Sequence, residues 1–246
     1  MSPRPLQALV TRPRNEAETL AAALAARGVD ALIEPLIEIR WRMPALLDLD
    51  GAQAVLCTSA NGVRALARVT GARNLPLFAV GDATAARARA EGFVAVESAG
   101  GDVADLVRLV AARLSPQRGR LVHVAGDVVA GDLAGRLRDH GFVVERAVLY
   151  EARPATALSL EARQAFAAGA IDVALFFSPR TAAIFARLAA AIRIGEQCRN
   201  VVALSISRAA DAALGDLPWR LRRIADAPNQ PALLDALDAV LMSQAR

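Results

Sequence analysis

Short apolar runs alternate with longer stretches of helical periodicity along most of this 246-residue chain. Apolar runs bounded by turn residues are typical of buried strands, and stretches of roughly ten to fifteen residues between them are typical of connecting helices. Ten such runs predict strands, at residues 6–10, 30–36, 52–58, 75–80, 93–97, 120–125, 142–150, 172–178, 200–206 and 220–225. Ten strands are too many for one common open sheet, so the pattern predicts an α/β protein with more than one sheet.

The pattern also repeats itself, but not in chain order. Residues 8–39 align without a gap on residues 121–152, which places Leu20 on Leu133, Leu24 on Leu137 and Gly28 on Gly141. Three further pairs follow in a common order, and they match Ser59 with Ser178 and Gly81 with Ser205. A unit that recurs in this way predicts two similar domains.

The order of the repeats predicts where the domains begin and end. One domain is continuous over residues 44–147, and the other is assembled from residues 1–36 and 156–246. The chain then crosses between the domains at residues 37–43 and 148–155, for which we expect a two-stranded β hinge. The predicted fold is two doubly wound parallel-sheet domains, with a cleft between them where strand ends and helix starts would bind a ligand.

The composition of the chain indicates what kind of core the domains have and where the protein is located. Hydrophobic residues make up 54% of the chain and aromatic residues only 4%, so we expect aliphatic cores. No apolar run reaches the roughly 18 to 20 residues of a membrane span, and the first residues lack the apolar core of a secretory signal. We therefore expect a cytoplasmic protein without a membrane partner, which disfavours a secreted solute-binding protein of similar shape.

The formal charge of +4 comes from arginines spread along the chain, so the sequence does not support nucleic-acid binding. A mildly basic chain would also suit an acidic small substrate. Cys57 and Cys198 stand far apart in or beside apolar stretches, and we interpret them as reduced structural thiols. His123 and His140 are interpreted as structural. Motifs for metal sites and for nucleotide binding are absent, so we expect no metal.

Candidate binding residues follow several strands, where each loop leads into a helix. Hydroxyl groups at such positions cap helices, and the free N–H groups of a helix start favour an anion such as a carboxylate. For any single loop, capping alone is an adequate explanation. Several such loops around one cleft indicate a ligand with many carboxylates. The candidates are Arg12, Thr58, Ser59, Asn61, Gly81, Thr84, Gly126, Ser178, Ser205, Ser207 and Arg208.

Tyr150 is the only tyrosine in the chain and lies on the second crossing. A phenol with a pKa of about 10 is protonated near neutrality, so it can donate a proton to a departing hydroxyl group. The alternative is that this amphipathic ring packs at the hinge. Position alone does not separate the two interpretations.

Several short motifs, taken in their order and spacing, resemble the uroporphyrinogen-III synthase family over nearly the whole chain. They are VTRP, EPLIEI, TSANGV, AVGDATA, ESAGGDVADL, HVAGD through AVLYEA, FFSPRTA and DAPNQPALLDAL. The resemblance implies two HemD-like, flavodoxin-like α/β domains joined by a β ladder. It also implies a cofactor-free, typically monomeric enzyme that cyclises hydroxymethylbilane with inversion of ring D to give uroporphyrinogen III and water. A transient contact with hydroxymethylbilane synthase is a further expectation.

The resemblance also implies roles for individual residues. Tyr150 would be the acid that assists loss of the hydroxyl group, and Ser59, Thr84 and Ser178 would contact or orient the substrate. Backbone amides near Gly81 and Gly126 would receive its acetate and propionate groups.

One loop departs from the family pattern: Ser205 and Arg208 stand where the family usually keeps a glycine and a threonine. Arg208 is either a partner for a substrate carboxylate or a surface charge. The same departure supports an alternative function, a non-catalytic two-lobed binding or regulatory protein.

Overall fold

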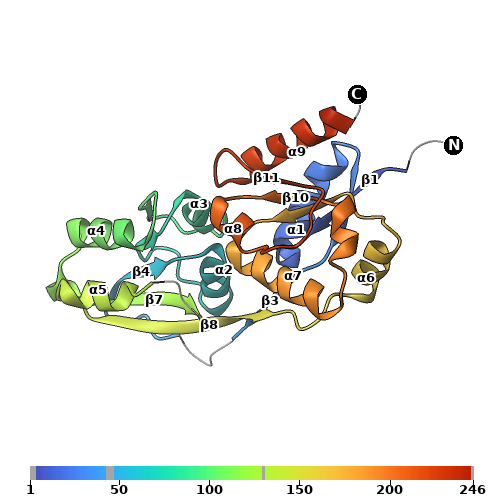
Figure 1. The fold of residues 1–246 in the computed structure, drawn as a ribbon. Coiled ribbons are helices and arrows are strands. Elements are labelled where there is room, and N and C mark those ends of the chain that lie inside the picture. Colours follow the sequence, from blue (N-terminus) through green and yellow to red (C-terminus); the bar gives the residue numbers. More distant parts are fainter. Residues whose placement is uncertain (1–3, 43–46, 129–130, 245–246) are drawn as a thin grey trace. The chain divides into compact units, whose positions relative to one another are not determined.

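The computed structural model describes residues 4–42, 47–128 and 131–244, which form two compact units (Figure 1). Unit 1 comprises residues 1–38 and 153–246, and unit 2 comprises residues 39–152. Residues 1–3, 43–46, 129–130 and 245–246 lie outside the described residues, and with them the end of the first expected crossing at residue 43 and the expected domain start at residue 44.

Unit 1 contains a five-stranded sheet in which every neighbouring pair is parallel. Its strand order is β11 (Leu221–Ile224), β10 (Val202–Ser205), β9 (Val173–Phe176), β1 (Leu6–Val10) and β2 (Val29–Ile33). The helices are α1 (Arg14–Ala25), α6 (Leu160–Ala167), α7 (Pro179–Ala191), α8 (Arg208–Ala212) and α9 (Gln230–Gln244), with a 3₁₀ turn at Glu196–Asn200. Strand β1, from the start of the chain, lies at an interior position between β9 and β2.

The two faces of this sheet have different cores. On one face, aliphatic residues of the strands pack with Leu20 and Leu24 of α1 and with Leu233 and Leu237 of α9. The other face carries an aromatic cluster in which Phe176 and Phe185 lie 5.4 Å apart between ring centroids, and Phe166 and Trp219 join them. The expectation of aliphatic cores is therefore wrong for this face, because a low aromatic content does not prevent a few rings from gathering in one place.

Unit 2 contains a six-stranded sheet. Its strand order is β3 (Ile37–Trp41), β8 (Val144–Pro154), β7 (Arg120–Gly126), β4 (Ala52–Cys57), β5 (Leu77–Ala79) and β6 (Val96–Ser98). The helices are α2 (Ala60–Val69), α3 (Asp82–Ala90), α4 (Val103–Arg113) and α5 (Leu133–Asp139), with a 3₁₀ turn at Pro116–Arg118. Helices α2 and α3 cover one face of the sheet, and α4 and α5 cover the other.

The two predicted crossings form β3 and the last part of β8, which are neighbouring strands. The amide of Arg42 donates to the carbonyl of Leu149, and the amide of Ala155 donates to the carbonyl of Leu36. The partner numbers fall on one strand as they rise on the other, so the two segments run antiparallel.

The two sheets have corresponding strand orders. Reading β11-β10-β9-β1-β2 in unit 1 against β6-β5-β4-β7-β8 in unit 2 pairs each strand with the one that the sequence repeat assigns to it. The helices correspond in the same way, since α7 and α8 match α2 and α3, while α1 and α9 match α5 and α4. The α/β class with two similar doubly wound sheets is confirmed.

Candidate active site

Ser59 and Tyr150 meet at the carboxyl end of the unit 2 sheet. The two hydroxyl oxygens lie 2.8 Å apart, within hydrogen-bond distance. Ser59 is also the N-cap of α2, because its side chain accepts a hydrogen bond from the amide of Gly62 at 3.0 Å. The capping interpretation of Ser59 therefore holds, and the cap fixes the serine that contacts the phenol.

Tyr150 is buried, with 8% of its surface exposed. Burial raises the pKa of the phenol because the anion would lose its hydration, and the nearby Cys57 and Asp127 act in the same direction. The hydrogen bond with Ser59 and one with the backbone at Gly126 oppose this rise. The net effect keeps Tyr150 protonated at neutral pH, as a proton donor must be.

The ring of Tyr150 lies directly against Gly126. A Cβ atom at position 126 would stand 2.8 Å from Cε2 of the ring and 2.9 Å from Cζ, closer than real Cβ atoms approach their neighbours. A larger residue at this position would displace the ring.

A pocket of about 330 Å³ opens beside this pair. Four of the predicted residues line it, namely Thr58, Ser59, Gly126 and Tyr150. The sequence reasoning missed the other lining residues, Val80, Asp102, Val103 and Val128. Asp102 also forms a capping box with Asp105 at the start of α4.

The side chain of Thr58 lies near a buried histidine, His123. His123 on β7 is 3% exposed, and its Nε2 lies 3.5 Å from the hydroxyl of Thr58. Burial, with a smaller contribution from Arg146, lowers the pKa of His123 to about 4. The imidazole is therefore neutral near pH 7, in agreement with its structural interpretation.

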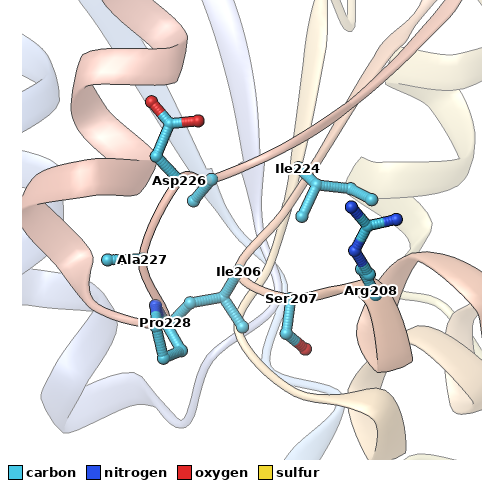
Figure 2. A pocket seen from close by; sticks show the side chains of 8 residues that line it. Ile206, Ser207, Arg208, Ile224, Asp226, Ala227 and Pro228 are labelled. Carbon is cyan, nitrogen blue, oxygen red and sulfur yellow. The ribbon is translucent and has the colours of Figure 1, made fainter.

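Unit 1 has a pocket of about 410 Å³ at the corresponding strand ends, lined by residues of the loops before α8 and α9. Ser207 and Arg208 line it together with Asp226 (Figure 2). Figure 2 shows Arg208 beside Ile224, with the carboxylate of Asp226 directed away from the guanidinium. Arg208 is exposed and has no ion-pair or hydrogen-bond partner within the described ranges.

The structure corrects the sequence match around this loop. The N-cap of α3 is Gly81, two residues after β5, and the N-cap of α8 is Ser207, two residues after β10. Gly81 therefore corresponds to Ser207 and not to Ser205. The sequence match was wrong by two residues because Ser205 and Ser207 are both small, and a gapless alignment can place either of them on Gly81.

The same shift relocates two other candidates. Thr84 corresponds to Ala210, and Arg208 corresponds to Asp82. Ser205 is fully buried at the end of β10, and its hydroxyl has no hydrogen-bond partner in the described part of the chain. Ser205 does not line the unit 1 pocket.

The remaining candidates have local partners. Arg12 forms an ion pair with Glu16, donates to Gln230 at 2.9 Å and stacks on Phe177. The amide oxygen of Asn61 accepts from Arg64, Thr84 is buried in α3, and Ser178 caps α7 as Ser59 caps α2. Capping or packing thus accounts for these residues within their own units.

Cys57 and Cys198 are buried free thiols, and burial raises the pKa of each to about 12. Within the described ranges, no three His, Cys, Asp or Glu side chains are grouped so that they could hold a metal ion. The described helices include none that is long and apolar enough to cross a membrane.

Comparison with known proteins assigns the chain to a family. The model of the family described as uroporphyrinogen-III synthase HemD matches residues 18–235. No curated protein matches the sequence.

Solved structures of two uroporphyrinogen-III synthases are similar to this chain in fold. One is the uroporphyrinogen-III synthetase of Helicobacter pylori, with a TM-score of 0.66 and 19% identity over 96% of this chain and 99% of that one. Another is a mutant uroporphyrinogen III synthase of the extremely thermophilic bacterium Thermus thermophilus, with a TM-score of 0.57 and 16% identity over 97% and 99%. The family model matches most of the sequence, and the chain belongs to the uroporphyrinogen-III synthase family of cyclising lyases.

Proposed function

We propose that the chain converts hydroxymethylbilane into uroporphyrinogen III and water, with Tyr150 as the proton donor to the departing hydroxyl group. The observation that carries this role is the contact between Ser59 and a buried, protonated Tyr150 at the edge of a 330 Å³ pocket. In this mechanism the phenol proton moves to the terminal hydroxyl as its C–O bond breaks. Water leaves, and the bilane becomes a cation stabilised by the pyrrole nitrogen.

The remaining steps need no further protein nucleophile. The substituted α carbon of ring D attacks the cationic methylene carbon. The older bond from that ring D carbon to the methylene of ring C then breaks, and the freed methylene, now a cation stabilised by the nitrogen of ring C, bonds to the unsubstituted α carbon of ring D, which inverts the ring. Loss of the proton from this α carbon restores aromaticity and reprotonates the phenolate. Positioning of the reacting carbons in the pocket would direct such a closure. Val80, Val103 and Val128 supply apolar lining for a pyrrole ring.

Arg208 is our proposed partner for a substrate carboxylate. Its guanidinium lines the unit 1 pocket and is exposed, so an ion pair there is worth about 0.2 to 1 kcal/mol. Arg208→Ala should therefore raise KM by about 1.4- to fivefold and change kcat little, because a contact made equally in ground and transition states affects KM alone. Arg199→Ala is the matched control, since Arg199 is an exposed arginine paired with Glu196 away from the pocket. An unchanged KM in Arg208→Ala would remove the role.

The alternative of a non-catalytic protein rested on the departure of this loop from the family pattern. That departure remains after the corrected match, because Ser207 and Ala210 stand at the positions that correspond to Gly81 and Thr84. No other observation favours it over the enzyme.

The test is to supply enzymatically generated hydroxymethylbilane, oxidise the products and separate the type I and type III uroporphyrins. Type III is the expected product, and formation of type I alone would exclude the activity. Tyr150→Phe should lower kcat by about 100-fold, at the low end of what a positioned general acid contributes. The control is the free energy of unfolding, which should fall by only about 1 kcal/mol for the lost hydrogen bond. Unchanged kinetics would remove the role of Tyr150.

We further propose that the enzyme works as a cytoplasmic monomer and contacts hydroxymethylbilane synthase transiently. The location rests on the apolar pattern of the sequence, and the monomeric state rests on the family resemblance. Sedimentation of the pure chain, alone and with that enzyme, tests the monomeric state and the contact, and a stable dimer would contradict the first.

A further inference from the structure

Strand β8 contains a bulge at Tyr150. Strands β7 and β8 pair Ala125 with Val148 but Gly126 with Tyr150, so Leu149 is an extra residue in β8. A bulge bends its strand and changes the direction of the side chains beside it, and bulges are frequent next to active sites. The direction of the Tyr150 phenol therefore depends on whatever holds this bulge.

Asp127 ties the bulged strand to the end of β7 through the backbone of Tyr150 and of Ala152. Its backbone amide donates to the carbonyl of Tyr150 at 3.0 Å, and its Oδ1 accepts from the amide of Ala152 at 3.1 Å. Arg146 in turn donates to the carbonyl of Asp127 at 2.8 Å and to that of Gly126. The loop after β7 is thus tied to β8 at several points around one residue.

The phenol ring has little room to move independently of its backbone. Gly126 lies against one edge of the ring, and Trp41 lies 6.4 Å away between ring centroids. Ser59 contacts the hydroxyl. A shift of the β8 backbone would therefore move the ring of Tyr150 away from Gly126 and its hydroxyl away from Ser59.

We propose that Asp127 is a positioning residue for the reaction: by tying Tyr150 and Ala152 to the end of β7, it places the phenol for proton donation. This inference rests on the proposed role of Tyr150. The carboxylate has a second, electrostatic effect, because its charge raises the pKa of the phenol. Among the described residues, the other charged or titratable groups of this region include Cys57 on β4, Asp102 at the start of α4, His123 on β7 and Arg146 on β8.

Two substitutions separate the hydrogen bond from the charge. Asp127→Asn keeps an oxygen that can accept from the amide of Ala152, whereas Asp127→Ala removes it. Asp132→Asn is the matched control, because Asp132 is an exposed acid whose side chain caps α5 through the amide of Gly135, away from Tyr150. Asparagine caps a helix as well as aspartate does.

The expected kinetics differ between the two variants. Asp127→Ala should lower kcat by about 10- to 100-fold with KM within about twofold, because a misplacement of about 1 Å can cost that much. Asp127→Asn should restore kcat to within about threefold of the unsubstituted chain. Asp132→Asn should match the unsubstituted chain.

A second readout does not depend on activity. Tyr150 is the only tyrosine, so phenolate absorbance near 295 nm titrates this residue alone. Asp127→Asn should titrate at a lower pH than the unsubstituted chain and Asp132→Asn.

Three results would overturn the proposal: full kcat in Asp127→Ala, equal losses in Asp127→Asn and Asp127→Ala, or identical titrations in Asp127→Asn and Asp132→Asn. Equal losses would mean that the carboxylate itself acts on the substrate. If Tyr150→Phe keeps full activity, the proposed role of Tyr150 fails instead, and the two failures are therefore distinguishable.

Discussion

Single buried residues set how the protein responds to pH, and His123 is the clearest case. It lies inside β7 with 3% of its surface exposed, and its pKa of about 4 is well below the ordinary value of 6.5. In the unfolded chain the imidazole takes up a proton below about pH 6.5. The folded chain resists this until about pH 4, so acid favours the unfolded state.

The direction in which stability changes with pH follows from this difference between the pKa of His123 in the folded chain and in the unfolded chain. The contribution of neutral His123 to stability is complete above about pH 6.5 and is lost as the pH falls through about 4. We expect the free energy of unfolding to fall by about 3 kcal/mol over this window from His123 alone. His123→Gln should remove that part of the decline, as measured by urea unfolding at pH 7.5 and pH 4.5.

His140→Gln is the control for this measurement, because His140 is exposed at the end of α5. It should keep the pH dependence of the unsubstituted chain. If His123→Gln also keeps it, then His123 does not contribute to acid unfolding.

Residue types alone predicted part of the site. Four candidates line one pocket: Thr58, Ser59 and Gly126, which were named from loops after strands, and Tyr150, which was named from the second crossing. Asp127 was not a candidate, because its role depends on a bulge that shifts the strand register by one residue. An apolar pattern of period two does not show which of two strands carries the extra residue.

Helix caps are the elements that connect the fold to the site. Ser59 and Ser178 occupy corresponding positions in the two units, and each accepts a hydrogen bond from the amide three residues later. Only Ser59 also contacts Tyr150. The repeat therefore provides a natural pair for separating capping from contact with the phenol.

Ser59→Ala and Ser178→Ala should each cost about 1 kcal/mol of stability for the lost cap. Only Ser59→Ala should change the titration of Tyr150. The hydrogen bond with Ser59 lowers the pKa of the phenol, so its removal should move the absorbance titration to higher pH. Equal titrations in the two variants would show that the Ser59 contact does not influence the phenol.

The strand order was predictable from sequence to the extent that repeats were recognisable. Leu20 and Leu133, and Leu24 and Leu137, all lie in the helix-to-sheet cores of their units, as the alignment implied. The loop before α8 was not predictable, because its cap is two residues from the aligned position. Short polar loops carry no apolar periodicity that could fix their alignment.

At the scale of the whole molecule, one unit is continuous and the other is not. The six strands of unit 2 all lie within residues 37–154, so its sheet is complete in that segment. Unit 1 needs β1 from the start of the chain, since β1 pairs with both β2 and β9. Its core also needs Leu20 and Leu24 of α1.

This difference predicts unequal fragments. A fragment of residues 37–154 should unfold cooperatively in urea, because it retains its sheet and both helix layers. A fragment of residues 155–246 should not, because without β1 and α1 the side chains of Val173, Leu175 and Leu237 lose the partners that bury them. Circular dichroism during urea titration measures both. Cooperative unfolding of 155–246 alone would mean that three strands and α9 suffice for a core, and unit 1 would then not depend on the start of the chain.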